Sequence, residues 1–194
     1  MRLHVIGDSH ASKRVWSGVR VRGLKIICHH IGDMTCAGFG LSSLDVALLG
    51  VKPSDWVCFC VGEIDCRVHM AEHENWKELT DKIVDNYMQK IATVQAARVF
   101  VFSVPPAVRR KQSQANEDFP YNGDDLERVV YVRYMNNRLM QGCFAHGFTF
   151  FDVHDKYADP DGLFTLKYKD FCVHIADPVF ITEFLKHEKS KSNS

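Results

Sequence analysis

Short apolar runs alternate with helical stretches along the whole chain of 194 residues, and this alternation limits the available folds more than any other feature. Five runs have the length and composition of buried strands: residues 3–7, 24–31, 56–61, 99–104 and 148–153. Strands that are apolar throughout, rather than at every second position, are typical of parallel sheets covered on both faces. The pattern therefore predicts an α/β fold, with helices on both sides of a parallel sheet.

Helices are expected between and after these strands, over residues 11–21, 41–50, 75–97, 124–146 and 178–187. The strongest periodicity lies in 75–97, where large apolar side chains recur at helical spacing. Gly147 and Pro178 are placed to end one helix and begin the next. Residues 34–40 and 109–123 are expected to be loops. No repeat or linker divides the chain, so we predict one domain over residues 1–188 and a frayed polar tail over 189–194.

The charge is balanced, with 24 Lys and Arg against 24 Asp and Glu. Dedicated nucleic-acid or membrane-surface binders carry a basic excess, so neither partner is expected. Seven cysteines is an odd number, and most lie inside apolar runs, which favours free thiols and a cytoplasmic location. The N-terminus lacks the apolar segment of a signal peptide, and no run approaches the ~20 residues that span a bilayer.

Chemistry is expected at the carboxyl ends of the strands, because ligands of parallel sheets gather there. Ser9 directly follows the first strand and is a candidate nucleophile; the alternative is a turn with Ser9 as a helix cap. A nucleophilic serine needs a base, and His174 is the best candidate among the ten histidines. Asp170 is near enough in sequence to orient its imidazole.

A metal site is the alternative use of the histidines. His69 and His73 have the i, i+4 spacing of a helical metal pair, but no third ligand is evident nearby, so a solvated helix face is the better interpretation. We predict no metal and no cofactor.

Taken in order, the residues at the strand ends resemble the SGNH (GDSL-like) hydrolases. The matching blocks are Gly7-Asp8-Ser9, a glycine-containing loop after the second strand, residues 62–65 (Gly-Glu-Ile-Asp) after the third, and Asp170 with His174. The resemblance covers nearly the whole chain, and the third block, Gly-Glu-Ile-Asp-Cys-Arg, resembles that of a subgroup. It implies a three-layer α/β/α fold with a flavodoxin-like, parallel five-stranded sheet. It also implies ester hydrolysis by a triad of Ser9 as nucleophile, His174 as base and Asp170 as orienting acid.

The resemblance further implies an oxyanion hole made by the N–H of Ser9, a glycine N–H and an asparagine side chain. Gly38 (or Gly40) matches the glycine, but Ile64 stands in the place of the asparagine. Losing one such donor typically costs ~100- to 1000-fold in rate. Arg67 could compensate, or could be a structural partner of Glu63 or Asp65.

His10 and Glu63 complete the expected site. His10 stands where the family usually has leucine. Together with Gly38, Arg67 and Glu63, it forms the expected oxyanion and substrate-binding set.

Three functions compete. The first is a serine esterase acting on a small acyl ester, such as an O-acetylated sugar. The second is a binding or scaffold domain that kept the fold and lost the activity, for which Ile64 is the main evidence. The third is a phosphatase with Asp8 as nucleophile, disfavoured because His10 occupies the place of its second aspartate. Residues 109–123 form either a substrate lid or a surface excursion.

Overall fold

A five-stranded sheet forms the centre of the computed structural model, which describes residues 1–113 and 118–192. The strands are β1 (Arg2–Gly7), β2 (Lys25–His30), β3 (Trp56–Cys60), β4 (Arg98–Phe102) and β5 (Thr149–Phe151). Their order is β2-β1-β3-β4-β5, and every neighbouring pair is parallel. The predicted α/β architecture with a parallel five-stranded sheet is confirmed.

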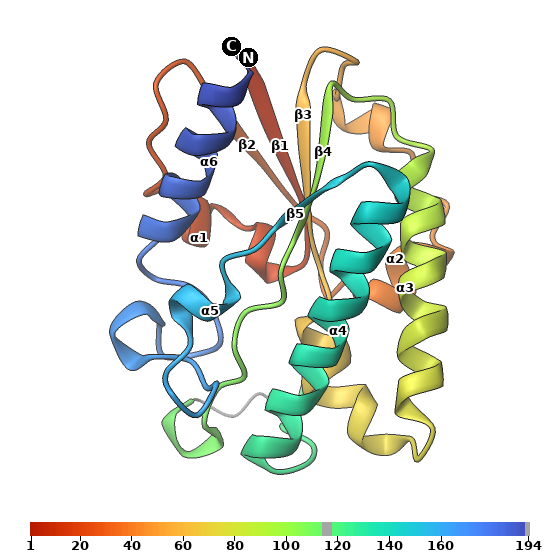
Figure 1. Cartoon of the computed structure of the whole chain (residues 1–194), viewed down its shortest axis with the longest axis vertical. Coiled ribbons are helices and arrows are strands. Elements are labelled where there is room, and N and C mark those ends of the chain that lie inside the picture. Colours follow the sequence, from red (N-terminus) through yellow and green to blue (C-terminus); the bar gives the residue numbers. More distant parts are fainter. Residues whose placement is uncertain (114–117, 193–194) are drawn as a thin grey trace.

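Helices cover both faces of this sheet (Figure 1). One layer contains α1 (Lys13–Trp16) and α6 (Val179–Lys191); the other contains α2 (Cys36–Leu41), α3 (Trp76–Ala92) and α4 (Asp125–His146). The short α5 (His154–Tyr157) follows β5. The C-terminal part of α6 lies at the amino end of the sheet, where Arg98 of β4 contacts Glu188 at 2.5 Å.

Alternate residues of the central strand β3 pack into two separate apolar clusters. Val57 and Phe59 join the cluster that includes Phe39, Tyr87 and Leu139 from α2, α3 and α4. Trp56, Cys58 and Cys60 join the cluster under α1 and α6. Both faces of the strand are therefore buried, which explains why it is apolar at every position.

Two helix predictions were wrong in the segment after β2. Residues 34–40, expected to be a loop, contain α2, and residues 41–50, expected to be a helix, form one 3₁₀ turn at Val46–Leu49. Leu41 and Leu48 are 78% and 84% exposed, whereas Leu44 and Leu49 pack against the core, so the leucines of this segment do not form one core-facing helix stripe. Asp45 caps the short turn and Gly50 ends it in the left-handed conformation at φ 77°.

Tertiary hydrogen bonds explain why α2 forms despite its glycines. The hydroxyl of Thr35 accepts a hydrogen bond from the N–H of Gly38 at 2.8 Å. The carboxylate of Asp65, which follows β3, accepts from the N–H groups of Cys36 at 2.6 Å and Ala37 at 3.2 Å. A cap supplied from a distant strand end cannot be recognised in a local pattern.

The remaining helices differ from expectation mainly in length. The expected helix 11–21 is limited to α1, whereas α4 has a capping box between Asp124 and Glu127 and ends at Gly147, as predicted. Helix α6 continues to Lys191, so residues 189–191 are helical rather than frayed; 193–194 lie outside the described residues.

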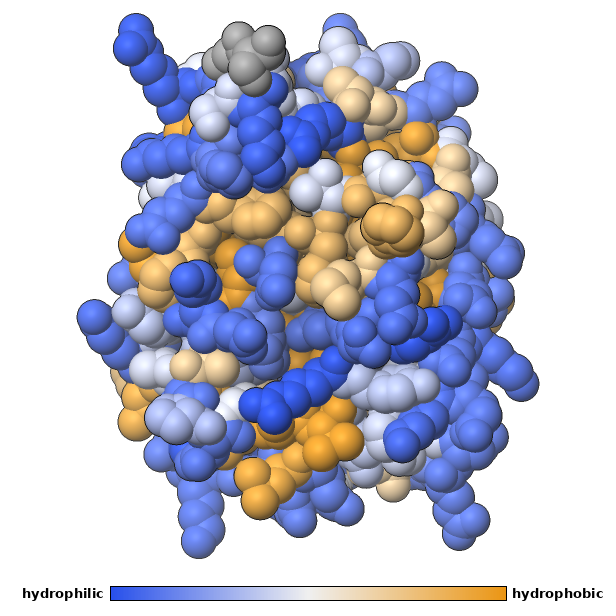
Figure 2. Space-filling model, in the orientation of Figure 1, coloured by the Kyte–Doolittle hydropathy of each residue, from blue (hydrophilic) through white to orange (hydrophobic). Residues whose placement is uncertain are grey.

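The surface is mixed rather than uniformly polar. Figure 2 shows apolar side chains among charged ones on the face that carries α4. The exposed large apolar residues of α4 are Leu126, Val130, Met140 and Phe144. Within the described ranges, no helix is both long and apolar enough to cross a membrane. All seven cysteines belong to the described part of the chain, and each is a free thiol.

Candidate active site

The turn after β1 is fixed by close contact with β3. A side chain at Gly7 would put its Cβ 1.9 Å from the carbonyl oxygen of Cys60, so no other residue fits there. The next N–H, of Asp8, donates to that same carbonyl at 3.1 Å. Ser9 therefore begins immediately beyond the carboxyl edge of the sheet, as the first residue of a 3₁₀ turn, Ser9–Ala11.

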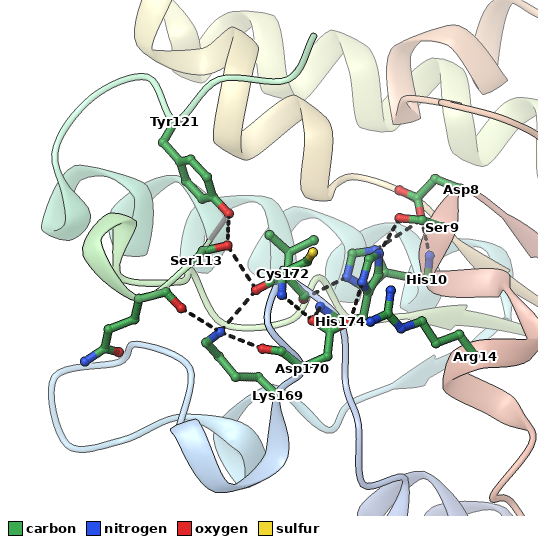
Figure 3. A network of polar contacts seen from close by, with 12 residues as sticks. Asp8, Ser9, His10, Arg14, Ser113, Tyr121, Lys169, Asp170, Cys172 and His174 are labelled. Carbon is green, nitrogen blue, oxygen red and sulfur yellow. Dashed lines mark hydrogen bonds and ion pairs between the residues drawn. The ribbon is translucent and has the colours of Figure 1, made fainter. Parts of the chain in front are cut away.

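Ser9, His174 and Asp170 form a continuous chain of polar contacts (Figure 3). The Oγ of Ser9 lies 2.9 Å from Nε2 of His174, and Nδ1 of His174 lies 2.9 Å from Oδ2 of Asp170. The guanidinium of Arg14, from α1, contacts that same carboxylate oxygen at 3.0 Å. Residues 165 positions apart are thus brought within hydrogen-bond distance.

The segment from Asp170 to His174 is held by its own side chain and by a lysine. Oδ1 of Asp170 accepts hydrogen bonds from the N–H groups of Cys172 at 2.7 Å and His174 at 3.1 Å. The ammonium of Lys169 donates to the carbonyls of Asp170, Cys172 and Gln112 at 2.7, 3.2 and 3.0 Å. These contacts fix the direction in which the imidazole of His174 points.

The loop 109–123 packs against this segment. The hydroxyl of Ser113 donates to the carbonyl of Cys172 at 3.2 Å and lies 2.5 Å from the hydroxyl of the buried Tyr121. Arg109 pairs with Asp159 and Asp161. Ser113 and Tyr121 therefore connect this loop to the segment that carries His174, whereas Arg109 connects it to the turn after α5. Its centre, 114–117, lies outside the described residues.

The pKa values of His174 and Asp170 are shifted in the directions that a base and its partner require. Burial, followed by the nearby charge of His10, lowers the pKa of His174 from its usual 6.5. For Asp170, burial alone would raise the pKa, but hydrogen bonds from His174 and the backbone N–H groups lower it on balance. A neutral imidazole beside an ionised carboxylate is the state that accepts a proton.

His10 lies behind the contacts that join Ser9, His174 and Asp170, and it is buried. Its Nδ1 is 3.2 Å from Oδ1 of Asp8, and its Nε2 is 3.2 Å from the carbonyl oxygen of Val173. The rings of His10 and His174 are 5.1 Å apart between centroids. His10 therefore packs against the ring of His174 and contacts the residue that precedes it.

Arg67 is occupied on every side of its guanidinium. Nε and Nη2 donate to the two carboxylate oxygens of Glu63 at 2.6 and 3.1 Å, and Nη1 donates to the carbonyl of Phe119. The ring of Tyr121 packs 5.1 Å from the guanidinium carbon. This arrangement favours a structural partnership of Arg67 with Glu63 over a role in binding an oxyanion.

No protein-family model and no curated protein sequence matches the chain. Solved structures do match it. A GDSL-like lipase from Bacteroides thetaiotaomicron has a TM-score of 0.66 at 13% identity, over 98% of this chain and 88% of that one. The aryl esterase of M. smegmatis has a TM-score of 0.63 at 14% identity, over 98% of both chains. An acetyl xylan esterase has a TM-score of 0.61 at 18% identity, over 98% of this chain and 99% of that one. The chain has the SGNH hydrolase fold.

The SGNH resemblance assigned an oxyanion role to Gly38, and the structure does not support that assignment. Gly38 is a helical residue whose N–H is already bonded to Thr35. Another glycine follows β2 more closely: the N–H of Ile31 donates to the carbonyl of Gly7 at 2.8 Å, which sets the following Gly32 beside the turn that carries Ser9. Gly32 has φ 54°, and the position of a Cβ there is open.

Two residues of the third block, Ile64 and Asp65, supply structure rather than polar groups at the site. Ile64 is buried, and Asp65 caps α2. Its burial raises the pKa of Asp65 despite the two backbone hydrogen bonds. The block therefore links β3 to the segment after β2.

Sequence reasoning missed Arg14 and Lys169, and it did not single out Gly32 within the glycine-containing loop after the second strand. Arg14 and Lys169 are ordinary cations in the sequence, and their contacts with Asp170 and its neighbours depend on tertiary structure. Gly32 could have been found, because it is the first glycine after the second strand.

His69 and His73 are the histidine pair considered for a metal ion. His69 pairs with Glu72 at 3.7 Å, on a partly exposed turn. Among the residues that the structure describes, no group of three or more His, Cys, Asp or Glu side chains could hold a metal ion.

Proposed function

We propose that the protein is a serine ester hydrolase of SGNH type, with Ser9 as nucleophile, His174 as general base and Asp170 as its orienting acid. The single observation that carries the proposal is the contact chain from Ser9 Oγ through both nitrogens of His174 to Asp170. A serine hydroxyl is a weak nucleophile until an adjacent base takes its proton, and this geometry provides one.

The proposed reaction has two halves. Ser9 Oγ bonds to the acyl carbon as its proton passes to Nε2 of His174, and the imidazolium then donates that proton to the departing alcohol. Water attacks the acyl-enzyme with His174 again as base, which releases the carboxylic acid and restores Ser9. Asp170 holds the Nδ1–H tautomer and stabilises the imidazolium in both halves.

The oxyanion of each tetrahedral intermediate needs hydrogen-bond donors near Ser9. We assign the N–H groups of Ser9 and Gly32 to this role. Ile64 cannot donate, and Arg67 is already occupied by Glu63 and Phe119. The proposed hole therefore has one donor fewer than the family pattern, and catalysis is expected to be slow.

A small acyl group is the proposed substrate feature. The cavity beneath the site, lined by Asp8, His10, Cys60, Glu63 and Ser103, measures about 10 Å³, which is room for one water molecule. Because this cavity cannot hold an acyl chain, the chain would have to lie on the solvent side of Ser9. A short chain leaves the least apolar surface in contact with water there. An O-acetylated sugar remains within this class, and one neighbour in fold is an acetyl xylan esterase.

Hydrolysis of aryl acetates tests the proposal. We expect wild-type protein to release the aryl alcohol and to react covalently with a fluorophosphonate at Ser9. The Ser9→Ala variant should do neither. Equal, zero turnover by both proteins on acetate, propionate and butyrate esters would contradict the proposed activity.

A scaffold or binding domain is the second candidate, because Ile64 removes a donor. Fluorophosphonate labelling separates the two. Labelling needs an activated serine but not a substrate of the right shape. A wild-type protein that resists the reagent under conditions where an active esterase reacts would favour the scaffold function.

A further inference from the structure

His10 is a buried histidine with a hydrogen-bond acceptor at each ring nitrogen. It is 3% exposed. The carboxylate of Asp8 lies 3.2 Å from Nδ1, and the carbonyl of Val173 lies 3.2 Å from Nε2. A backbone carbonyl cannot donate, and a carboxylate accepts. A neutral imidazole has one N–H and could satisfy one of them, whereas an imidazolium satisfies both.

The charges around the ring favour the protonated form. Four buried or nearly buried groups lie together: Asp8 on the turn, Glu63 and Arg67 beyond β3, and His10 itself. With His10 protonated, the two carboxylates are matched by two cations. With His10 neutral, the cluster would hold one uncompensated negative charge, which is unfavourable away from water.

The contacts of Asp8 also favour a protonated His10. Its Oδ1 accepts the backbone N–H of His10 at 2.8 Å, in addition to facing the ring. Its Oδ2 is buried and has no hydrogen-bond partner among the described residues. A carboxylate with so few donors is best stabilised by a full positive charge on the adjacent ring.

The ring is also connected to the base. Val173, whose carbonyl His10 contacts, directly precedes His174 in the chain, and the two imidazoles are 5.1 Å apart. On the far side of His174, Asp170 contacts its Nδ1 and Arg14 contacts Asp170. His174 thus lies between an acidic partner and the His10 ring (Figure 3).

We propose that His10 is a buried imidazolium that anchors the chain at Val173 and keeps His174 neutral in mildly acidic solution. His10 is then a positioning residue, acting on the reaction through His174. This inference rests on the proposed function, because it assigns His174 the role of base.

The directions of the pKa shifts agree with this geometry. Burial would lower the pKa of His10, but the Asp8 charge and hydrogen bond, with smaller contributions from Glu63 and Val173, raise it overall. Burial and then the charge of His10 lower the pKa of His174. The pKa values of the two neighbouring histidines therefore diverge, so that one ring is charged while the other is free to accept a proton.

Nitrogen NMR of the histidines tests the protonation state without any need for activity. In Ser9→Ala protein, we expect both ring nitrogens of His10 to carry protons at pH 7, and His174 to be neutral there. His174 should titrate below its usual value. An unprotonated Nδ1 on His10 at pH 7 would overturn the proposal, whether or not the protein hydrolyses esters.

The coupling to His174 is tested by His10→Gln. Removing a neighbouring charge typically shifts a pKa by about one unit or more, so the acid limb of kcat/KM should move up by about one pH unit. The same rise in the pKa of His174 should appear by NMR in the double variant His10→Gln, Ser9→Ala. A folded His10→Gln protein with an unmoved acid limb and an unmoved His174 titration would contradict the coupling.

Arg14→Gln is the matched control. It also removes a positive charge near His174, but the Arg14 side chain is 59% exposed, so water screens its charge. We expect a shift in the same direction and smaller. An equal or larger shift than that of His10→Gln would show that general charge, rather than the buried ring, sets the pKa of the base, and would overturn the assignment.

Discussion

Two aspartate–histidine pairs lie side by side in this molecule and differ in what the second ring nitrogen meets. In the pair of Asp170 and His174, Nε2 faces the hydroxyl of Ser9, which can donate a proton. In the pair of Asp8 and His10, Nε2 faces a carbonyl, which can only accept. The first pair is half-buried at the sheet edge, and the second is enclosed beneath it.

The comparison shows that the identity of the residues does not determine their function. Both pairs have a carboxylate at Nδ1, yet the pKa of His174 is lowered by burial and by the His10 charge, while that of His10 is raised by Asp8 against its burial. In the proposed assignment, the third contact and the surrounding charge separate the two rings, one as a base and the other as a fixed cation.

Replacing the base should have the largest effect. His174→Asn removes the proton acceptor of Ser9, and loss of a triad member typically lowers kcat by about 10⁴-fold or more. His10→Gln, assayed at its own pH optimum, should lose far less. Aryl acetate kinetics on both variants, with circular dichroism to confirm folding, provide the measurement. Comparable losses in the two would mean that the pairs do not have separate roles.

The acid of the first pair should come next. Asp170→Asn keeps the size of the side chain but favours the tautomer of His174 that directs Nε2–H at Ser9, so kcat should fall by about 10²- to 10⁴-fold. The control is Asp159→Asn, which alters a carboxylate outside the triad that pairs with Arg109. Retention of most activity by Asp170→Asn would exclude Asp170 as the orienting acid.

Sequence reasoning found the first pair and not the second, for a physical reason. Ser9 directly follows a strongly patterned strand, Asp170 and His174 stand in the segment before the last helix, and a known family carries the same order. The partner that distinguishes His10 is the carbonyl of Val173, 163 positions away, and no side-chain pattern encodes a carbonyl contact.

The fold shows the same division between local and distant signals. All five strands were predicted because a buried parallel strand is apolar throughout. Helix α2 was missed because it contains two glycines and depends on a cap from Asp65. The resemblance matched Gly38 to the glycine of the oxyanion hole, and the helix that occupies its N–H was not foreseen.

Arg67→Ala should affect stability more than catalysis. The substitution leaves Glu63 buried without its partner, and breaking a buried pair in this way typically costs about 3–5 kcal/mol. We expect kcat per folded molecule to fall less than about tenfold, because the guanidinium is occupied by Glu63 and Phe119. Denaturant melts and kinetics on one preparation give both numbers.

Arg98→Ala is the matched control for Arg67. Arg98 pairs with the buried Glu188 at the start of β4, at the opposite end of the sheet from Ser9. It should lower stability without changing kcat. A much larger fall in kcat for Arg67→Ala than for Arg98→Ala would restore a catalytic role for Arg67.

The smallest expected effect is the pH dependence of stability, and it separates the two pairs by sign. The pKa of His10 is raised on folding, so protonation of His10 stabilises the fold. This contribution is complete at pH values below the unfolded-state pKa of 6.5. That contribution is lost as the pH rises through the folded value. For His174, whose pKa is lowered, protonation opposes folding, so stability falls as the pH drops below 6.5.

The free-energy difference of unfolding between wild type and His10→Gln should therefore be greatest near pH 6 and shrink toward pH 9. His187→Gln, which removes an exposed imidazole from α6, is the control for the loss of a histidine outside the site. Urea melts of the three proteins at matched ionic strength provide the measurement. A His10→Gln difference that instead grew as the pH rose would mean that His10 is neutral in the folded state, and the two pairs would then no longer differ in charge.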